Sequence, residues 1–236
     1  ILSLTMLLSF FSLFFIYNLI FFKKKNINHL SEDINILIYL IIVIVLSFIF
    51  FNYDNNFLII LVSICSSVSN IGISFQEVPK NLIFVFLLLV ILGGSFFSTS
   101  SGLRVIKVIT LVKFSLNNLL SHSKPNQVYS TKLSLNKTST NINDISKYFL
   151  AIIIFIISLF IVTLLLTLSN LSFEVSFKLG ILTLMNTVNS SMYNLSDINF
   201  YNFNLFSKVS LIIFMIIGRI EFLSIIILFK KFLLKI

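Results

Sequence analysis

The sequence has little of what soluble enzymes and secreted domains use, and each scarcity excludes a class of protein. Its 236 residues include one cysteine, two histidines, two prolines, six glycines and no tryptophan. The single Cys65 excludes a disulfide framework within the chain and a multi-cysteine metal site. His29 and His122 lie far apart in polar stretches, where we expect solvated loop residues. Because the sequence also has no nucleotide-binding loop, metal-ligand spacing or nucleophile–base pair, we expect neither an enzyme nor a bound cofactor.

Apolar residues are what the chain has in excess. Hydrophobic residues make up 58% of it, and the mean hydropathy is +1.07. A soluble domain of this size does not tolerate so much apolar surface, whereas several lipid-spanning helices require it. The composition therefore predicts an all-α integral membrane protein. Apolar sequence starts at Ile1 without the cationic segment of a signal peptide, so we expect the chain to be part of a longer protein.

Positive charge is placed unevenly along the chain. There are 17 Lys and Arg residues against 8 Asp and Glu, a formal net charge of +9. Most of the basic residues fall into three groups that flank apolar runs, at 23–25, 104–147 and 230–235. Because basic residues gather on the cytoplasmic side of membrane proteins, these groups predict cytoplasmic edges rather than a nucleic-acid surface.

The lengths of the apolar runs predict which segments cross the membrane. A hydrocarbon core is about 30 Å thick and needs about 20 apolar residues. The runs of sufficient length are 1–22, 34–51, 81–116, 148–168 and 205–234. Two further runs, 57–68 and 173–187, are too short and predict re-entrant helices. The order of helix, short helix with polar stretch, and helix occurs twice, at a spacing of about 117 residues from Ser69 to Asn186.

A polar stretch follows each short run, and the sequence allows an ion site there. Backbone that is neither helix nor closed sheet survives at membrane depth only beside protein or water. The C-terminus of a short helix carries partial negative charge, and the carbonyl groups after it can replace the water shell of a cation. Gly72 permits backbone angles that turn carbonyls inward. An ordinary surface loop is the alternative that these residues leave open.

Glycine and hydroxyl residues interrupt the long run at 81–116. Counted from the predicted outer end, Gly93 falls about 18 Å along the helix, near the middle of the membrane. Glycine and serine disfavour a continuous helix there. Two interpretations stay open: a movable flap across a pore, or the end of one helix and the start of a cytoplasmic one. The residues of the predicted flap are Gly93, Gly94, Ser95, Ser98, Thr99, Ser100, Ser101 and Gly102.

Three segments carry a family resemblance: GGSFFSTSSGLRVIKVITLVK, LFSKVSLIIFMIIGRIEFLSIIILF and MNTVN. The first contains Gly-Gly-x-x-x-Ser-Thr-x-x-Gly-hydrophobic-Arg-Val-Ile-Lys, and the second contains Gly-Arg-Ile-Glu. Together they resemble the TrkH/KtrB superfamily of bacterial potassium-uptake proteins, in which such patterns mark the third and fourth repeats. The resemblance covers nearly the whole chain and implies the C-terminal half of a TrkH-type transporter in the bacterial cytoplasmic (inner) membrane.

The resemblance implies a pore of four pseudo-equivalent helix–pore-loop–helix units with re-entrant pore helices. Residues 1–31 would hold the last helix of the second unit and a cytoplasmic link, and 32–116 the third unit. A cytoplasmic linker at 117–146 and the fourth unit at 147–236 would follow. The implied function is potassium uptake through a carbonyl-lined filter and a gated intramembrane loop, which is the predicted flap. The implied filter residues are Ser69, Asn70, Ile71, Gly72, Asn186, Thr187, Val188 and Asn189.

The fourth unit contains one departure from the family pattern and one unusual charge. Asn189 stands where the filter glycine is usual, which leaves a sodium-passing or sodium-coupled transporter as the alternative. Asparagine tolerates left-handed backbone angles well, so a filter geometry is still compatible with it. Arg219 lies inside the last apolar run, and the resemblance implies that it faces the pore beside the flap.

The resemblance also implies partners. These are a second copy of the transporter, in a homodimer, and a cytosolic nucleotide-binding TrkA-type regulatory subunit that contacts the linker. A multi-pass membrane enzyme acting on lipids is the remaining alternative from another class. It would need paired acidic or histidine residues at a membrane edge, and the adjacent pair Glu32–Asp33 is better explained as a helix start.

Overall fold

The computed structural model describes residues 2–11, 40–41, 45, 57–73, 77–94, 98, 100–123, 142–187, 192–196 and 198–219. Its helices are α1 (Leu2–Leu8), α4 (Phe57–Ser69), α5 (Ile83–Ile91), α6 (Val105–Ser123), α7 (Ile142–Thr167), α8 (Phe173–Leu184) and α9 (Leu205–Arg219). Two short strands, β1 (Leu92–Gly93) and β2 (Leu103–Arg104), and two 3₁₀ turns, Lys80–Leu82 and Phe200–Asn202, complete the described elements. The predicted spans 1–22 and 34–51 lie mostly outside these ranges.

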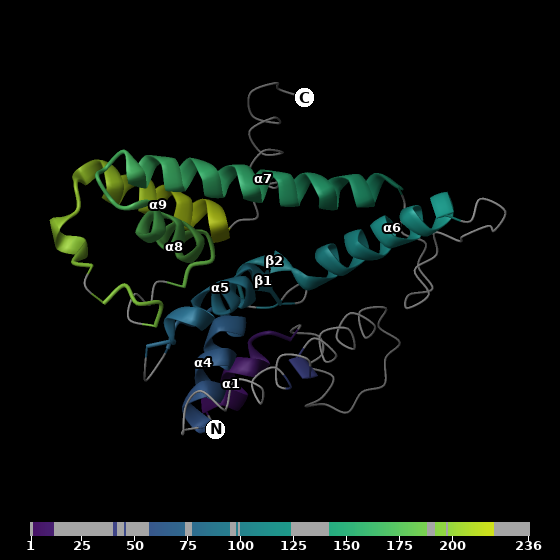
Figure 1. The fold of residues 1–236 in the computed structure, drawn as a ribbon, viewed down its shortest axis with the longest axis horizontal. Coiled ribbons are helices and arrows are strands. Elements are labelled where there is room, and N and C mark those ends of the chain that lie inside the picture. The colour runs from purple at the N-terminus through teal and green to yellow at the C-terminus, as the bar shows by residue number, and fades with distance from the viewer. Residues whose placement is uncertain are drawn as a thin grey trace.

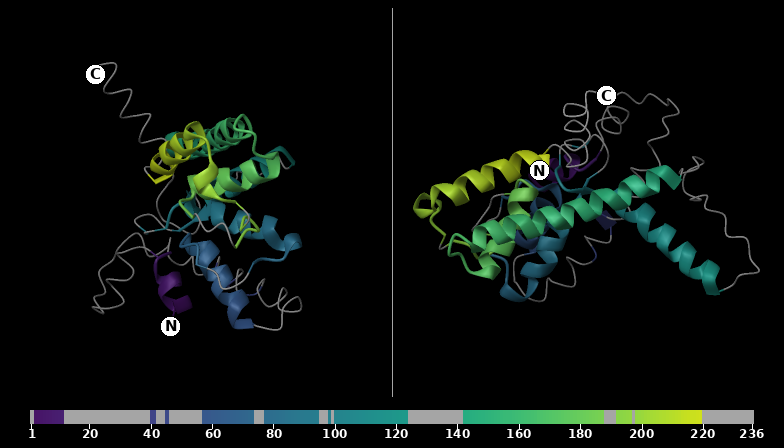
Figure 2. Two further views of the ribbon diagram at one scale, coloured as in Figure 1. Left: turned by 90° about the vertical axis from the view of Figure 1, so that its left-hand side faces the viewer. Right: turned by 90° about the horizontal axis from the view of Figure 1, so that it is seen from above.

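Two groups of helices meet at α5 and α8. In Figure 1, α7, α8 and α9 lie together in one group, and α1 lies beside α4 in the other. α8 packs against both α7 and α9, while α4 packs against α1 and α5. α5 joins the two groups because it contacts α4 and also α8. Figure 2 shows α6 running outward from this body past one end of α7.

Among the described residues, α7 is the one helix long and apolar enough to cross a membrane, with its apolar part at Ile145–Thr167. Its side chains face largely outward, as the exposed Phe160 and Leu164 show. The segments Leu58–Ser69 and Lys80–Ile91 are apolar but shorter. The two short helices lie where their apolar runs predict them. α4 ends one residue beyond the predicted run, and α8 ends at Leu184 rather than at 187.

Two helices extend into the linker predicted at 117–146, since α6 continues to Ser123 and α7 begins at Ile142. The bounds of the linker as a domain stay a prediction. No glycine or proline follows Gly102 until Pro125, so nothing in the sequence stops α6 earlier. The run predicted as one span from residue 1 breaks after Leu8. There the Ser9 hydroxyl donates to the Met6 carbonyl at 2.6 Å and competes with the helix hydrogen bonds.

α8 lies at the centre of its group. Most of its residues from Ser176 onward are buried, including Leu179 and Leu182. Gly180 allows α7 to approach closely, since a Cβ there would lie 3.1 Å from the Thr163 methyl carbon. The central position of α8 fixes the direction in which its C-terminus points and therefore fixes one half of the site described next.

Candidate functional site

The two short helices end in the same hydrogen-bonded cap. After α4, Asn70 has a φ of 58° and its N–H donates to the Ser67 carbonyl at 3.3 Å. The next N–H, of Ile71, donates to the Ser66 carbonyl at 3.2 Å. This pair of bonds around a left-handed residue is the Schellman cap, in which asparagine is the usual substitute for glycine.

The cap after α8 repeats this pattern. Asn186 has a φ of 56°, and its N–H donates to the Thr183 carbonyl at 3.2 Å. The N–H of Thr187 donates to the Leu182 carbonyl at 2.9 Å. The structural equivalence therefore pairs Asn70 with Asn186, a spacing of 116 residues, and the predicted pairing of Ser69 with Asn186 is one residue out of register. The cause is that α4 keeps Ser69 as its last helical residue.

The predicted filter residues are thus placed in part. Ser69 belongs to the helix, Asn70 and Asn186 are the left-handed cap residues, and Gly72 also has a positive φ, of 78°, which favours glycine. Ile71 is exposed, while Thr187 is buried. Val188 and Asn189 lie outside the described residues.

Unpaired polar atoms gather at both helix ends. Asn70 Oδ1, Asn186 Nδ2 and Thr187 Oγ1 are buried and have no hydrogen-bond partner within the described part of the chain. Two of these three atoms are oxygens that accept hydrogen bonds or ligate cations. Each lies beside the negative end of a helix dipole. The α4 end therefore offers a cation one free acceptor, Asn70 Oδ1, while the α8 end offers one acceptor, Thr187 Oγ1, and one donor, Asn186 Nδ2.

The predicted flap is a loop closed at its neck. α5 ends at Ile91, and β1 then pairs in parallel with β2, Leu92 opposite Leu103 and Gly93 opposite Arg104. A Cβ on Gly93 would lie 2.5 Å from the Ser101 carbonyl oxygen, so only glycine permits this approach. Gly102 has a φ of 104°, which also requires glycine. We call residues 94–102 the gate loop.

The gate loop touches the ends of both short helices through a single residue. The Asn70 side-chain amide donates to the Ser101 carbonyl at 2.8 Å. The Ser101 hydroxyl donates to the carbonyl of Met185, the residue that caps α8. Ser101 is 8% exposed, so both bonds are shielded from water. This one serine joins two caps that lie more than a hundred residues apart in sequence.

Hydrogen bonds inside the gate loop hold its shape. The Ser100 hydroxyl accepts from the Gly94 N–H at 2.9 Å and lies 3.0 Å from the Ser98 hydroxyl. Arg104 Nη1 donates to the Ser98 hydroxyl at 2.9 Å and to the Ser100 carbonyl at 3.2 Å. Of the other predicted flap residues, Ser95 and Thr99 lie outside the described residues. The sequence identifies Arg104 only as a basic residue at a membrane edge, and its role in bracing the loop needs the folded geometry.

Arg219 is the last described residue of α9 and is exposed. No hydrogen bond joins it to the described residues of the gate loop, so its predicted position beside the flap stays a prediction. The neighbouring residue Gly218 lies in close contact with α8 and not with the gate loop. The backbone of α9 there packs directly on the Leu184 carbonyl at the end of α8, where a Cβ would overlap.

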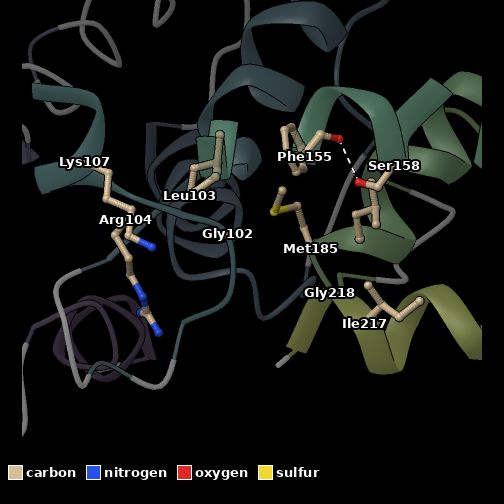
Figure 3. Close-up of a pocket in the computed structure, with 11 residues that line it drawn as sticks. Gly102, Leu103, Arg104, Lys107, Phe155, Ser158, Met185, Ile217 and Gly218 are labelled. Atoms are coloured by element: carbon tan, nitrogen blue, oxygen red, sulfur yellow. Dashed lines mark hydrogen bonds between the residues drawn. The ribbon is translucent and has the colours of Figure 1, made fainter. Parts of the chain in front are cut away.

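A cavity of about 70 Å³ lies beside the neck of the gate loop. Figure 3 shows Arg104 and Lys107 on one side of it and Met185, Ile217 and Gly218 on the other. The cavity therefore lies between the strand residues of the neck and α9, beside the point where Ser101 bonds to the Met185 carbonyl.

A further contact joins the segment after the second cap to the first short helix. The Val78 N–H donates to the Met192 carbonyl at 3.0 Å. The hydroxyl of Tyr193, which is fully buried, lies 3.4 Å from the hydroxyl of Ser67 on α4. The sequence gives no signal for this role, because Tyr193 is one aromatic residue in a polar stretch.

These features define a helical fold with two similarly capped short helices, a loop that is hydrogen-bonded to both caps, and one helix long and apolar enough to span a membrane. The fold resembles the crystal structure of the potassium transporter TrkH from Vibrio parahaemolyticus, with a TM-score of 0.71. The two sequences are 20% identical, and the match covers 82% of this chain. The chain spans 42% of the length of that transporter. No family model and no curated protein matches the sequence.

Proposed function

We propose that this chain supplies two neighbouring units of a four-unit pore for potassium uptake across the bacterial inner membrane, with residues 94–102 as its gate. The observation that carries the proposal is the position of Ser101, bonded at once to Asn70 and to the Met185 carbonyl. The likeness of the fold to TrkH supports it. A loop that only connects α5 to α6 does not need hydrogen bonds to the caps of both α4 and α8.

The mechanism follows from the two caps. Each helix C-terminus carries roughly half a negative charge, and two such ends in one pore attract a cation. Carbonyl groups of the residues that follow the caps would replace the water lost by the ion. The unpaired Asn70 Oδ1 and Thr187 Oγ1 add one acceptor at each cap. The gate loop lies directly against the caps, so it closes the path until its bonds to them break.

A sodium-passing pore is the second candidate function, because Asn189 stands where a filter glycine is usual. The backbone angles at the two caps bear on this candidate. Asn70 and Asn186 both hold left-handed angles, so asparagine is compatible with such backbone in this chain. We therefore favour potassium. The lipid-enzyme alternative depended on Glu32 and Asp33, which lie outside the described residues.

We also propose the partners that a transporter of this kind requires. A second copy of the complete protein would form a homodimer, and a cytosolic nucleotide-binding subunit of the TrkA type would act on the linker. The potassium ion is the substrate in this proposal. A regulatory subunit acting there would move the gate loop through α6, which begins directly after β2.

The test is rubidium and sodium uptake by the full-length protein in cells that lack their own potassium uptake. Asn186→Ala should abolish most rubidium flux because alanine resists the left-handed angle of the cap. Asn170→Ala is the matched control, since Asn170 also has a positive φ, of 67°, but is exposed at the end of α7. Sodium flux without rubidium flux would favour the second candidate. No flux of either ion, or equal loss in both variants, would refute the pore.

A further inference from the structure

A groove separate from the caps lies between α5 and α8, at the end where both helices begin. Its volume is about 600 Å³. One wall comes from the 3₁₀ turn and α5, with Lys80 and Phe84, and the other from the first turns of α8, with Phe173 and Phe177. Phe84 is 63% exposed and Phe173 68% exposed. Exposed phenylalanines beside lysines form an amphipathic surface, on which apolar groups of a ligand can contact the rings and charged groups the lysines.

Three charged side chains line this groove: two lysines, Lys80 and Lys178, and the carboxylate of Glu174. Lys178 is buried and donates to Glu174 at 2.6 Å, whereas the Glu174 side chain is 77% exposed. The hydrogen bond from Lys178 holds the pKa of Glu174 below its ordinary value, so this carboxyl is ionised. Lys80 is exposed at the rim and lies near enough to Glu174 to act on it electrostatically. Lys178 is thus paired with Glu174, while Lys80 and most of the Glu174 side chain are exposed.

One acceptor in the groove has no donor. The Oδ1 atom of Asn194 is buried and has no hydrogen-bond partner among the described residues, and Asn194 lines the groove. This oxygen has almost no accessible surface, so a ligand in the groove does not contact it. The groove therefore offers a cation at Lys80 and a carboxylate at Glu174 above an apolar, aromatic wall.

We propose that this groove binds a phospholipid with an ethanolamine headgroup. Its phosphate would lie at Lys80, its ammonium would donate to the exposed carboxylate of Glu174, and its acyl chains would follow Phe84 and Phe177. A choline lipid has the same charges but no N–H donor, and a glycerol lipid has no cation for the carboxylate. The proposal rests on the chain lying in a membrane and not on the ion it conducts.

The test measures the melting temperature of the purified full-length protein in detergent while phosphatidylethanolamine, phosphatidylcholine or phosphatidylglycerol is added. A ligand that binds only the folded state raises the melting temperature according to its Kd. We expect the ethanolamine lipid to bind about tenfold or more tightly than the choline lipid, because a charge-assisted hydrogen bond is lost with the latter.

Lys80→Gln should remove most of the stabilisation by the ethanolamine lipid. Lys113→Gln is the matched control, since Lys113 lies on α6 and does not line this groove. Equal shifts with ethanolamine and choline lipids would overturn the proposal, as would a larger shift with the glycerol lipid. A full shift retained in Lys80→Gln would place the lipid elsewhere and overturn it as well. No ion flux is measured, so failure here is distinct from failure of the proposed pore.

Discussion

The hydroxyl of Ser101 gives the sharpest test of the gate. Ser101→Ala removes the bond to the Met185 carbonyl but keeps the backbone carbonyl that accepts from Asn70. A buried neutral hydrogen bond contributes about 0.5–1.5 kcal/mol, with about 1 kcal/mol as the central value. If the loop is the closed gate, that loss shifts its equilibrium towards opening by about fivefold at 1 kcal/mol and about twofold to twelvefold across the range.

The assay is rubidium uptake by the full-length protein in cells without their own potassium uptake, normalised to the amount of protein in the membrane. Ser121→Ala is the matched control, because Ser121 makes a similar side-chain bond, to the Asn118 carbonyl at 2.7 Å, on the exposed surface of α6. Asn70→Gly is the companion variant. It removes the amide donor and keeps the backbone freedom that the φ of 58° needs. Unchanged or lower flux in Ser101→Ala, with normal protein levels, would refute the gate.

Three further predictions concern the same region. Gly93→Ala places a Cβ 2.5 Å from the Ser101 carbonyl oxygen, so it should push the gate loop away and raise rubidium flux; flux at the parent level would contradict the closed neck. Arg104→Gln removes the bonds from the guanidinium to the loop, so it should loosen the closed loop and raise rubidium flux, and flux at the parent level would count against bracing by this residue. Gly218→Ala makes a Cβ overlap the Leu184 carbonyl, so the yield of folded protein should fall steeply; an undiminished yield would show that α9 does not pack there.

Much of the helical arrangement follows from local properties of the sequence. α4 and α8 begin at the first residues of their apolar runs, Phe57 and Phe173, because the length and position of an apolar run depend on neighbouring residues alone. The break between α5 and α6 is likewise predictable from glycine and serine at 93–102. What hydropathy does not give is the register of the repeat. It depends on which residue turns left-handed, and Asn70 rather than Ser69 does so.

The site contacts are the part that the sequence does not predict. The bond between Asn70 and Ser101 joins residues 31 apart, and that between Ser101 and Met185 joins residues 84 apart. Such bonds depend on how α4 and α8 pack, and no local pattern encodes that packing. Hydroxyl residues in the loop were predicted as a group, but which of them reaches a helix cap is decided by the two-residue pairing of β1 with β2.

Under the proposed function, the caps would connect selectivity to gating. The positions of filter carbonyl groups would then depend on the left-handed residues that begin each polar stretch, Asn70 and Asn186. Ser101 holds the Asn70 side chain and the carbonyl directly before Asn186. A loop that leaves the pore must release both contacts, so each cap is freer when the gate is open than when it is closed. The proposed gate and the proposed filter would therefore be two parts of one hydrogen-bonded unit, and a substitution at Ser101 is expected to change ion preference as well as flux.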